Sequence, residues 1–227
     1  MRKLFCVLLC LALCVIGAAL AEENGGAFTP ASDFEFLIEN GECTVTGYTG
    51  EAAEVSIPPE IGGFPVTGIG YRAFYCRGGL TAVTIPEGVT SIGIAAFFDC
   101  ENLESVTIPE GVTTVAREAF AFCSGLTEIT LPESVTSIEE YAFYFCENLE
   151  SVAIPEGVTA IGAGTFGRCE NLLSATIPAG VTAIDDYAFA DCESLQTILG
   201  APDSFAQTWA EERGHDFGIF TPDTPTE

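Results

Sequence analysis

A repeat of 23 residues dominates this sequence. The segment Leu126–Asn148 reads LTEITLPESVTSIEEYAFYFCEN, and closely similar segments begin at Leu103 and at Leu149. Five contiguous units run from residue 80 to residue 194, with partial units on both sides. A fixed period in this range is the signature of a solenoid, in which each unit forms one coil of the chain. The repeat therefore constrains the fold more strongly than any single residue does.

Each unit contains two apolar patterns that predict short strands. The first is Leu-x-x-Val-x-Ile-Pro, as in the segment from Leu80 to Pro86. Alternating β-branched residues indicate a strand with one buried face, and proline ends it because proline lacks the N–H that a ladder needs. The second and weaker pattern is Val-Thr-x-Ile, as in Val89–Ile92. Each coil is therefore expected to contribute one strand to a parallel sheet and a second short strand to another face.

A phenylalanine follows the second pattern in strict register, and stacked coils would align these rings in one aromatic spine. Its members are Phe74, Phe97, Phe120, Phe143, Phe166 and Phe189. The Ala-Phe segment around each ring is too short for a regular helix and predicts a tight helical or 3₁₀ turn. No coil can bury its Leu, Val, Ile and Phe side chains alone, so neighbouring coils must stack.

The combined pattern L-x-x-V-x-I-P-x-x-V-T-x-I-x-x-x-A-F-x-x-C resembles the leucine-rich repeats of the BspA-like, or type-5, family of bacterial surface and secreted proteins. The resemblance covers residues 33–220. It implies a leucine-rich repeat solenoid of the α/β class, rich in β structure, with right-handed coils and a cap at each end. It also implies export from the cell and, as for several members of the family, adhesion to host proteins.

The first residues have the composition of a secretory signal. Two basic residues precede the apolar run Leu4–Ile16, and Ala19-Leu20-Ala21 is a suitable cleavage site, so residues 1–21 are expected to be a signal peptide. A membrane anchor is the alternative, but the apolar run is marginal in length for a span and is followed directly by acidic residues. The cleaved chain is therefore expected to be secreted or held at the cell surface, without membrane insertion.

Residues 22–65 predict a lead-in and an N-terminal cap. Residues 22–33 are polar and are expected to be flexible, whereas residues 34–65 are expected to form a hairpin and the first repeat strand. The Asn40-Gly41 pair is a strong hairpin signal. Extra residues near Ile61–Pro65 predict a loop, and residues 66–198 are expected to form the solenoid itself.

Residues 199–220 predict a C-terminal cap made of a short helix and a strand. Ser204 supplies a capping-box start, Gly214 supplies a stop, and Phe205 and Trp209 share one helix face. Trp209 is expected to lie over the last coil. His215, the sole histidine, is expected to be a solvated turn residue, and residues 221–227 are expected to be disordered.

The chain is strongly acidic, with 33 Asp and Glu against seven Lys and Arg and a formal net charge of −26. This balance argues against nucleic acid and against anionic membranes as partners, because both are bound through basic patches. Four glutamates that follow the strand prolines should stack on successive coils: Glu87, Glu110, Glu133 and Glu156. We expect these to be solvated, with weak Ca²⁺ binding as the alternative hypothesis because Ca²⁺ prefers oxygen ligands.

Seven cysteines follow the expected signal peptide, and five of them recur with the repeat: Cys100, Cys123, Cys146, Cys169 and Cys192. Side chains on parallel coils point the same way, so this column predicts buried free thiols rather than disulfides. If any bridge forms, Cys43 and Cys76 are the expected pair, since Cys76 lies one residue out of register. No Cys-x-x-Cys metal motif is present, and neither a metal nor another cofactor is expected.

The outward positions of the first strand are mostly small or hydroxylated and hold no Trp, Tyr or Arg, the residue types that dominate binding hot spots. The best candidates for a binding surface are the tyrosines and arginines on the other side of each coil. They are Tyr71, Arg72, Arg117, Tyr141, Tyr144, Arg168 and Tyr187. No obvious patch joins them in the sequence, and the tyrosines are expected to be partly packed.

No catalytic constellation can be assembled around His215 or from the adjacent acidic pairs, so no catalytic residues and no enzyme activity are expected. The sequence favours a monomeric extracellular module that binds a protein or a glycan, an expectation that rests mainly on the family resemblance. A structural spacer in a larger surface assembly is the alternative, and the bland strand face favours it. A third class, ice binding through the threonine column, would need a second threonine in each strand where isoleucine occurs.

Overall fold

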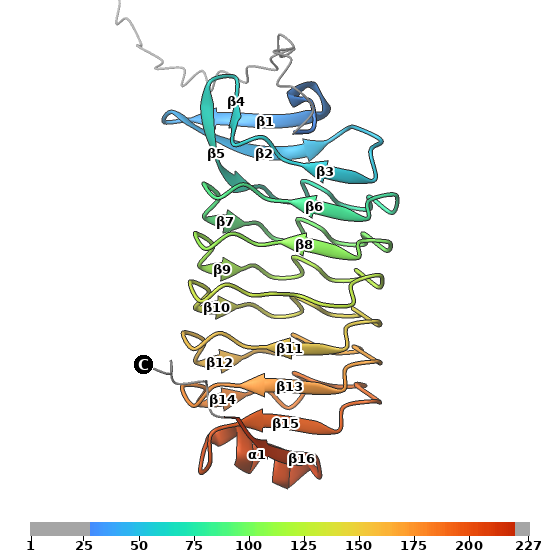
Figure 1. Cartoon of the computed structure of the whole chain (residues 1–227), viewed down its shortest axis with the longest axis vertical. Coiled ribbons are helices and arrows are strands. Elements are labelled where there is room, and N and C mark those ends of the chain that lie inside the picture. The colour runs from blue at the N-terminus through green and yellow to red at the C-terminus, as the bar shows by residue number, and fades with distance from the viewer. Residues whose placement is uncertain (1–27, 221–227) are drawn as a thin grey trace, which may run out of the picture.

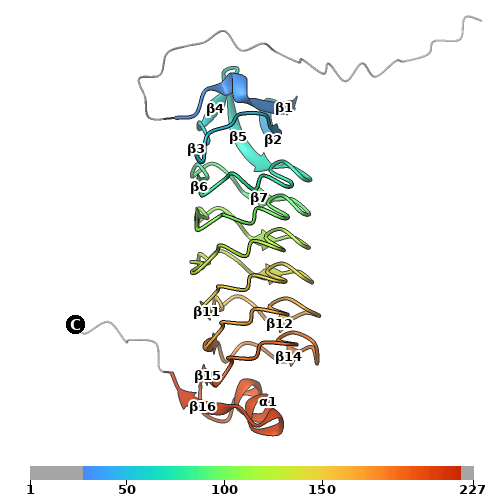
Figure 2. The same ribbon diagram turned by 90° about the vertical axis from the view of Figure 1, so that its right-hand side faces the viewer.

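A computed structural model describes residues 28–220, which form a single column of stacked coils (Figure 1). The expected signal peptide, the start of the lead-in and the tail after residue 220 lie outside the described residues. A hairpin closes the N-terminal end of the column and helix α1 (Phe205–Arg213) closes the other end. In Figure 2, strands β3, β6, β11 and β15 lie along one side of the column. The predicted solenoid is confirmed.

The first predicted pattern of the repeat forms the main sheet. Its neighbouring strands are parallel and shifted by one repeat, so that Val83 pairs with Val106 and Ala175 pairs with Ile198. The middle residue of each strand points into the core and its neighbours point outward or lie at the surface. The strands are β3 (Glu54–Ser56), β6 (Ala82–Thr84), β8 (Ser105–Thr107), β11 (Ser151–Ala153), β13 (Ser174–Ile177), β15 (Thr197–Gly200) and β16 (Asp216–Ile219).

The second pattern forms the predicted short strands, most of them only two residues long. They pair in parallel from coil to coil, as Ile92 does with Val115. The strands are β5 (Phe64–Ile69), β7 (Ser91–Ile92), β9 (Thr114–Val115), β10 (Ser137–Ile138), β12 (Ala160–Ile161) and β14 (Ala183–Ile184).

Both sheets are interrupted near the middle of the column, which the uniform repeat did not predict. Residues 128–130 form no strand, so β8 and β11 belong to separate sheets. On the other face, β10 and β12 also belong to separate sheets. Glu128 and Leu131 stand where most neighbouring coils have a small or hydroxylated residue and an isoleucine, and both changes lower strand propensity.

The turn segment around each Ala-Phe pair differs from the predicted helical or 3₁₀ turn. Alternate N–H groups donate to the carbonyl three residues earlier or to a carbonyl of the next coil. Ala121 N–H donates to Glu118 O at 3.1 Å, for example, whereas Phe122 N–H donates to Tyr144 O at 2.7 Å. Glu118 and Phe122 lie in the left-handed region, with φ of 58° and 62°, which breaks any helix. The segment is therefore a series of turns tied to its neighbouring coil.

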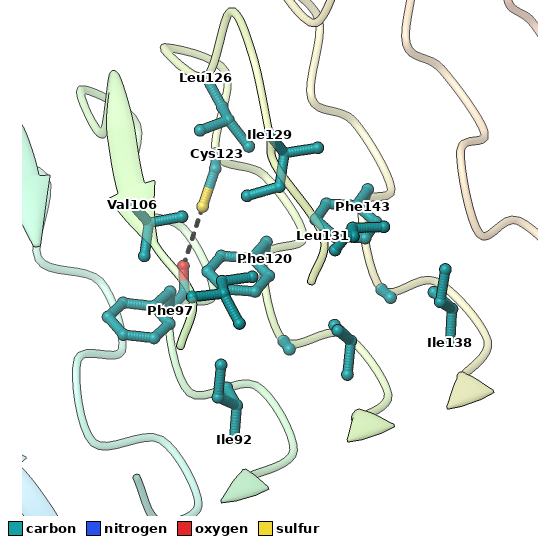
Figure 3. Packing of buried hydrophobic residues seen from close by; sticks show 14 of the residues in the cluster. Ile92, Phe97, Val106, Phe120, Cys123, Leu126, Ile129, Leu131, Ile138 and Phe143 are labelled. Atoms are coloured by element: carbon teal, nitrogen blue, oxygen red, sulfur yellow. Dashed lines mark hydrogen bonds between the residues drawn. The ribbon is translucent and has the colours of Figure 1, made fainter. Parts of the chain in front are cut away.

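The phenylalanine column forms the predicted aromatic spine. Phe97, Phe120 and Phe143 are fully buried, and successive ring centroids lie 5.1 Å and 5.5 Å apart with nearly parallel planes (Figure 3). The stack extends beyond the six predicted rings at both ends. Its full order is Phe34, Tyr48, Phe74, Phe97, Phe120, Phe143, Phe166, Phe189, Trp209 and His215. One stack therefore joins the two caps through every coil.

The N-terminal cap is the predicted hairpin of β1 (Phe34–Glu39) and β2 (Glu42–Tyr48), with positive φ at both turn residues, Asn40 and Gly41. Strand β2 pairs in parallel with β5 and so extends the second sheet. The expected loop near Ile61–Pro65 is instead a second hairpin between β4 (Glu60–Ile61) and β5. Gly62 and Gly63 make this hairpin possible, because both adopt positive φ. A short 3₁₀ helix, η1 (Ala31–Asp33), precedes β1.

The C-terminal cap has the predicted helix and strand. Ser204 Oγ accepts a hydrogen bond from Gln207 N–H, and Gly214 ends the helix with φ of 77°. Trp209 is buried under the last coil as expected, whereas Phe205, one turn earlier on the helix, is 42% exposed. The expectation of a solvated His215 is wrong, because its ring stacks on Trp209 at 5.5 Å. No helix in the described part of the chain is long and apolar enough to cross a membrane.

The seven cysteines of residues 28–220 are all free, so the Cys43–Cys76 bridge, which the sequence left open as the pair to form if any did, is absent. Cys43 is buried, whereas Cys76 is exposed and its thiol donates to Asp99 Oδ2 at 3.2 Å. The repeated cysteines form the predicted thiol column inside the solenoid. Burial raises the pKa of Cys43 to about 11 and that of Cys146 to about 12.

Candidate functional site

The turn segments present side chains along one edge of the column, because each segment buries its Ala-Phe pair and turns the flanking residues outward. In the segment 117–123, Ala119 and Phe120 are buried, whereas Arg117 is exposed and Phe122 is half-buried. Left-handed backbone costs a residue with a side chain about 1–2 kcal/mol. Hydrogen bonds to the next coil, such as that from Phe122 N–H, offset this cost.

Four half-buried aromatic rings form a second stack along this edge. Tyr75 and Phe98 stack with centroids 5.1 Å apart and planes 10° apart. Phe98 then meets Phe122 at 5.1 Å, and Phe122 meets Phe145 at 5.0 Å. These four rings lie outside the spine and are partly exposed to solvent.

A guanidinium covers each end of this second stack. Arg72 lies 4.5 Å from the centroid of the Tyr75 ring, and Arg168 lies 5.4 Å from that of Phe145. Both are cation–π contacts, in which the positive charge faces the negative face of the ring. We name this set the outer stack and define it as Arg72, Tyr75, Phe98, Phe122, Phe145 and Arg168.

Two further groups of side chains join the outer stack from its sides. Tyr144 meets Phe122 edge-on at 5.6 Å, Tyr141 meets Tyr144 edge-on at 5.7 Å, and Arg117 lies 5.8 Å from the Tyr141 centroid. At the N-terminal end, Arg72 also lies 5.0 Å from the centroid of Tyr71, which is 61% exposed.

Two glycines make room for the two packed tyrosines. A Cβ atom at Gly164 would lie 2.4 Å from the Tyr141 ring, and one at Gly167 would lie 3.1 Å from the Tyr144 ring. Gly164 holds φ of 60° at the repeat position where Tyr141 itself has φ of 60°. Glycine is therefore needed there for the space above the backbone, since a residue with a side chain adopts the same backbone conformation one coil earlier.

The structure brings six of the seven predicted binding residues into one connected surface. Only Tyr187 stands apart; it is 70% exposed and makes no aromatic or cation–π contact with the described residues. Tyr141 and Tyr144 are half-buried, as expected, whereas Tyr71 is not. The prediction missed Tyr75, Phe98, Phe122 and Phe145. The available signal was an aromatic residue directly after the spine phenylalanine or directly before the repeated cysteine.

Positive charge is concentrated on the same edge of an acidic molecule. Four of the five arginines between residues 28 and 220 lie in the turn segments, and the fifth, Arg213, lies in the C-terminal cap. Arg117 pairs with Glu118 at 3.2 Å and Arg168 pairs with Asp191 at 3.6 Å. These pairs are largely exposed and contribute little to the stability of the fold.

The main sheet presents a different surface. Its outward residues are short, such as Ser105 and Thr107 on β8 and Ser151 on β11, and they are exposed as predicted. The four glutamates of the calcium hypothesis lie in the loops after the strands, where Glu156 N–H donates to Glu133 Oε2 at 3.4 Å. Within residues 28–220, no group of three or more His, Cys, Asp or Glu side chains is placed to hold a metal ion.

The turn edge carries residue types that are common in binding surfaces. His215 is engaged in the cap, where its Nδ1 lies 3.1 Å from Leu195 O and its ring stacks on Trp209. The outer stack offers apolar ring edges beside guanidinium donors. Such a surface can bury apolar groups and donate hydrogen bonds to acceptors on a partner.

Comparison with known proteins gives the same repeat. The family model described as BspA type leucine rich repeat region matches residues 67–196 in six copies. No curated protein matches the chain.

Solved structures with the same fold come from several bacteria. The Treponema pallidum leucine-rich repeat protein TpLRR is 28% identical and has a TM-score of 0.74, with 84% of this chain and 98% of that chain covered. A leucine-rich cell surface protein of Faecalibacterium prausnitzii is 35% identical and has a TM-score of 0.62, with 76% of this chain and 54% of that chain covered. The match thus spans about half the length of the Faecalibacterium protein. The family model covers more than half of the chain, so this chain belongs to the BspA-type leucine-rich repeat family.

Proposed function

We propose that this chain is a non-catalytic interaction module, secreted or held at the cell surface, that binds a protein partner through the outer stack. The observation that carries the proposal is the outer stack itself. Tyrosine, phenylalanine and arginine are enriched in the cores of protein–protein interfaces, whereas lysine and glutamate are depleted there. In this chain those residue types gather on one edge, whereas the outward residues of the main sheet are mostly short.

The extracellular location of the module is supported by the family. One relative at 35% identity is described as a leucine-rich cell surface protein. The N-terminal sequence, with two basic residues, an apolar run and Ala19-Leu20-Ala21, is that of an export signal.

A structural spacer is the second candidate function, and the main sheet favours it. Its outward residues are mostly short in the strands β6, β8, β11 and β13 and include no large aromatic group there. A spacer needs no binding surface, however, and the outer stack would then expose ring edges without a role.

The experiment is capture of purified extracellular-matrix proteins and mucin on the immobilised chain, at low and high salt. The turn-edge variant combines Tyr71→Ser, Arg72→Ser and Arg168→Ser, which are exposed positions, so the fold should be retained. The matched control combines Thr84→Ala, Thr107→Ala and Ala153→Ser on the main sheet, which are also exposed. Circular dichroism and the melting temperature establish that each sample is folded.

We expect saturable binding of at least one protein, an affinity at least tenfold lower for the turn-edge variant, and no change for the main-sheet variant. The absence of binding by a folded wild-type chain would favour the spacer. Loss of binding in the main-sheet variant alone would place the interface on the main sheet and contradict the proposed role of the outer stack.

A further inference from the structure

A hollow of about 400 Å³ opens beside the outer stack, between two successive coils of the second sheet. Strand β10 lines one side and the start of β12 lines the other. Arg117 and Glu140 lie at the rim nearest the turn edge, where Arg117 also contacts Tyr141. The lining residues are Arg117, Thr136, Ser137, Ile138, Glu139, Glu140, Thr159, Ala160 and Gly162.

The hollow exists because the second sheet is interrupted at this level and because the residues at its floor are small. At three other coil-to-coil steps a backbone hydrogen bond crosses here, as from Glu139 N–H to Val115 O at 3.0 Å and from Asp185 N–H to Ile161 O at 2.9 Å, whereas no such bond is present from Ala116 N–H to Ile92 O among the described residues. Within the described chain, no such bond joins Gly162 to Ile138. Gly162 also lies between Glu139 and Asp185 in the repeat register, so a space is left between two longer side chains.

The polar groups of the hollow are positioned by the protein. Glu139 Oε2 accepts a hydrogen bond of 2.8 Å from Arg117 N–H, which fixes the carboxylate across two coils. Arg117 Nε donates to Glu118 Oε1 at 3.2 Å, so its remaining guanidinium donors are free for other contacts within the described residues. Hydroxyl groups of Thr136, Ser137 and Thr159 complete the set. The hollow therefore combines carboxylates that accept hydrogen bonds, guanidinium groups that donate them, and hydroxyl groups that can do either.

This combination discriminates between classes of ligand. An anionic group would face Glu139 and Glu140 in a chain of net charge −26. A cationic group would face the Arg117 guanidinium at the rim. A neutral ligand with many hydroxyl groups can bond to both the negative and the positive side chains. Each of its hydroxyl groups can donate to a carboxylate and accept from a guanidinium or another hydroxyl.

We propose that this hollow is a binding site for a neutral saccharide. The proposal rests on the proposed role of the chain as a binding module, but it uses residues outside the outer stack. Threonine methyl groups and Ala160 supply apolar contacts for the sugar ring, and the polar groups at the rim fix its orientation.

The experiment is isothermal titration of the purified chain with neutral trisaccharides built from glucose, galactose, mannose and N-acetylglucosamine. Sialyllactose serves as the anionic probe and trilysine as the cationic probe. The diagnostic variant is Ala160→Gln, which fills the hollow from an exposed position. Its matched control is Ala183→Gln, because Ala183 is exposed and pairs with Ala160 in register on the next strand.

We expect at least one neutral trisaccharide to bind saturably, with a Kd at least tenfold higher for Ala160→Gln and unchanged for Ala183→Gln. Glu139→Gln should also weaken binding at least threefold while the melting temperature is maintained. Equal effects of the two alanine substitutions, or no binding of any neutral trisaccharide, would overturn the site. Tighter binding of sialyllactose or trilysine would overturn the assigned ligand class.

The two proposals fail separately. The turn-edge variant defined above leaves the hollow intact, so it should lose the protein partner and retain the saccharide. Ala160→Gln should do the reverse.

Discussion

The thiol of Cys123 donates a hydrogen bond of 3.1 Å to the carbonyl oxygen of Phe97, 26 residues earlier (Figure 3). Both groups are completely buried, so neither can bond to water instead. The same bond joins the cysteine of every coil to the spine phenylalanine of the preceding coil, for Cys100, Cys123, Cys146, Cys169 and Cys192. Within residues 28–220, Phe97 O accepts no backbone hydrogen bond, so the Cys123 thiol satisfies a buried carbonyl that would otherwise be unpaired. Other spine carbonyls, such as Phe120 O, also accept a backbone N–H.

Replacing Cys123 by alanine should lower the free energy of unfolding by about 1–3 kcal/mol, because the Phe97 carbonyl loses its partner and the core loses a sulfur atom. Urea unfolding followed by circular dichroism measures this change. The exposed Cys76 provides the control, since Cys76→Ala should change stability by less than about 0.5 kcal/mol. Equal losses for the two substitutions would contradict a structural role for the buried thiol.

Stability should fall at high pH because of the buried thiols. Burial raises the pKa of Cys146 from 9.0 to about 12, so above pH 9 the unfolded chain loses this proton while the folded chain keeps it. The free energy of unfolding therefore falls between pH 9 and about pH 12, by about 1.4 kcal/mol per pH unit for each such thiol. Below pH 9 the thiol is protonated in both the folded and the unfolded chain, so the free energy of unfolding keeps its full value.

Urea unfolding of wild type and of Cys146→Ala at several pH values between 8 and 11 tests this relation. The free energy of unfolding of the variant should fall less steeply with pH, by the contribution of one thiol, about 1.4 kcal/mol per pH unit. Identical slopes in the two proteins would show that the Cys146 proton does not distinguish the folded from the unfolded chain.

Gly164→Ala should destabilise the protein by about 1–3 kcal/mol, because the new methyl group meets the Tyr141 ring at 2.4 Å. Removing the ring should relieve the clash, so adding Tyr141→Ala should recover part of the loss. A double-mutant cycle of the two substitutions measures the coupling by urea unfolding. Strict additivity would mean that Tyr141 does not lie over Gly164 in solution.

The middle of the column should open more readily than its ends. No backbone hydrogen bond donated by Glu128, Ile129 or Thr130 is present among the described residues. Amide hydrogen exchange should therefore be faster at residues 128–130 than in β6 or β13. Uniform protection along the main sheet would contradict the interruption.

The repeat predicted those features that depend on one coil resembling the next. The Phe column gave the spine, because a constant period places equivalent side chains one above another. The two strands, the thiol column and the hairpin at Asn40-Gly41 followed for the same reason or from local turn chemistry. The prediction of a helical turn was wrong, because the sequence does not reveal that residues such as Glu118 and Tyr141, which are not glycine, adopt left-handed backbone.

The outer stack was harder to predict because its rings change register. Tyr75 and Phe98 directly follow the spine phenylalanine, whereas Phe122 and Phe145 directly precede the repeated cysteine. The stack becomes continuous because Phe98 and Phe122 meet at 5.1 Å across two neighbouring positions of the turn. The hollow could not be predicted at all, since it depends on where the second sheet is interrupted.

Hydroxyl-radical footprinting of the chain, free and saturated with the protein captured from the extracellular panel, tests most directly whether the outer stack is the binding surface. Oxidation of Tyr75, Phe98, Phe122 and Phe145 should fall at least threefold in the complex. Oxidation of Tyr187, which is 70% exposed and outside the connected surface, should stay constant. Unchanged oxidation of the four rings in a saturated complex would contradict the proposed interface.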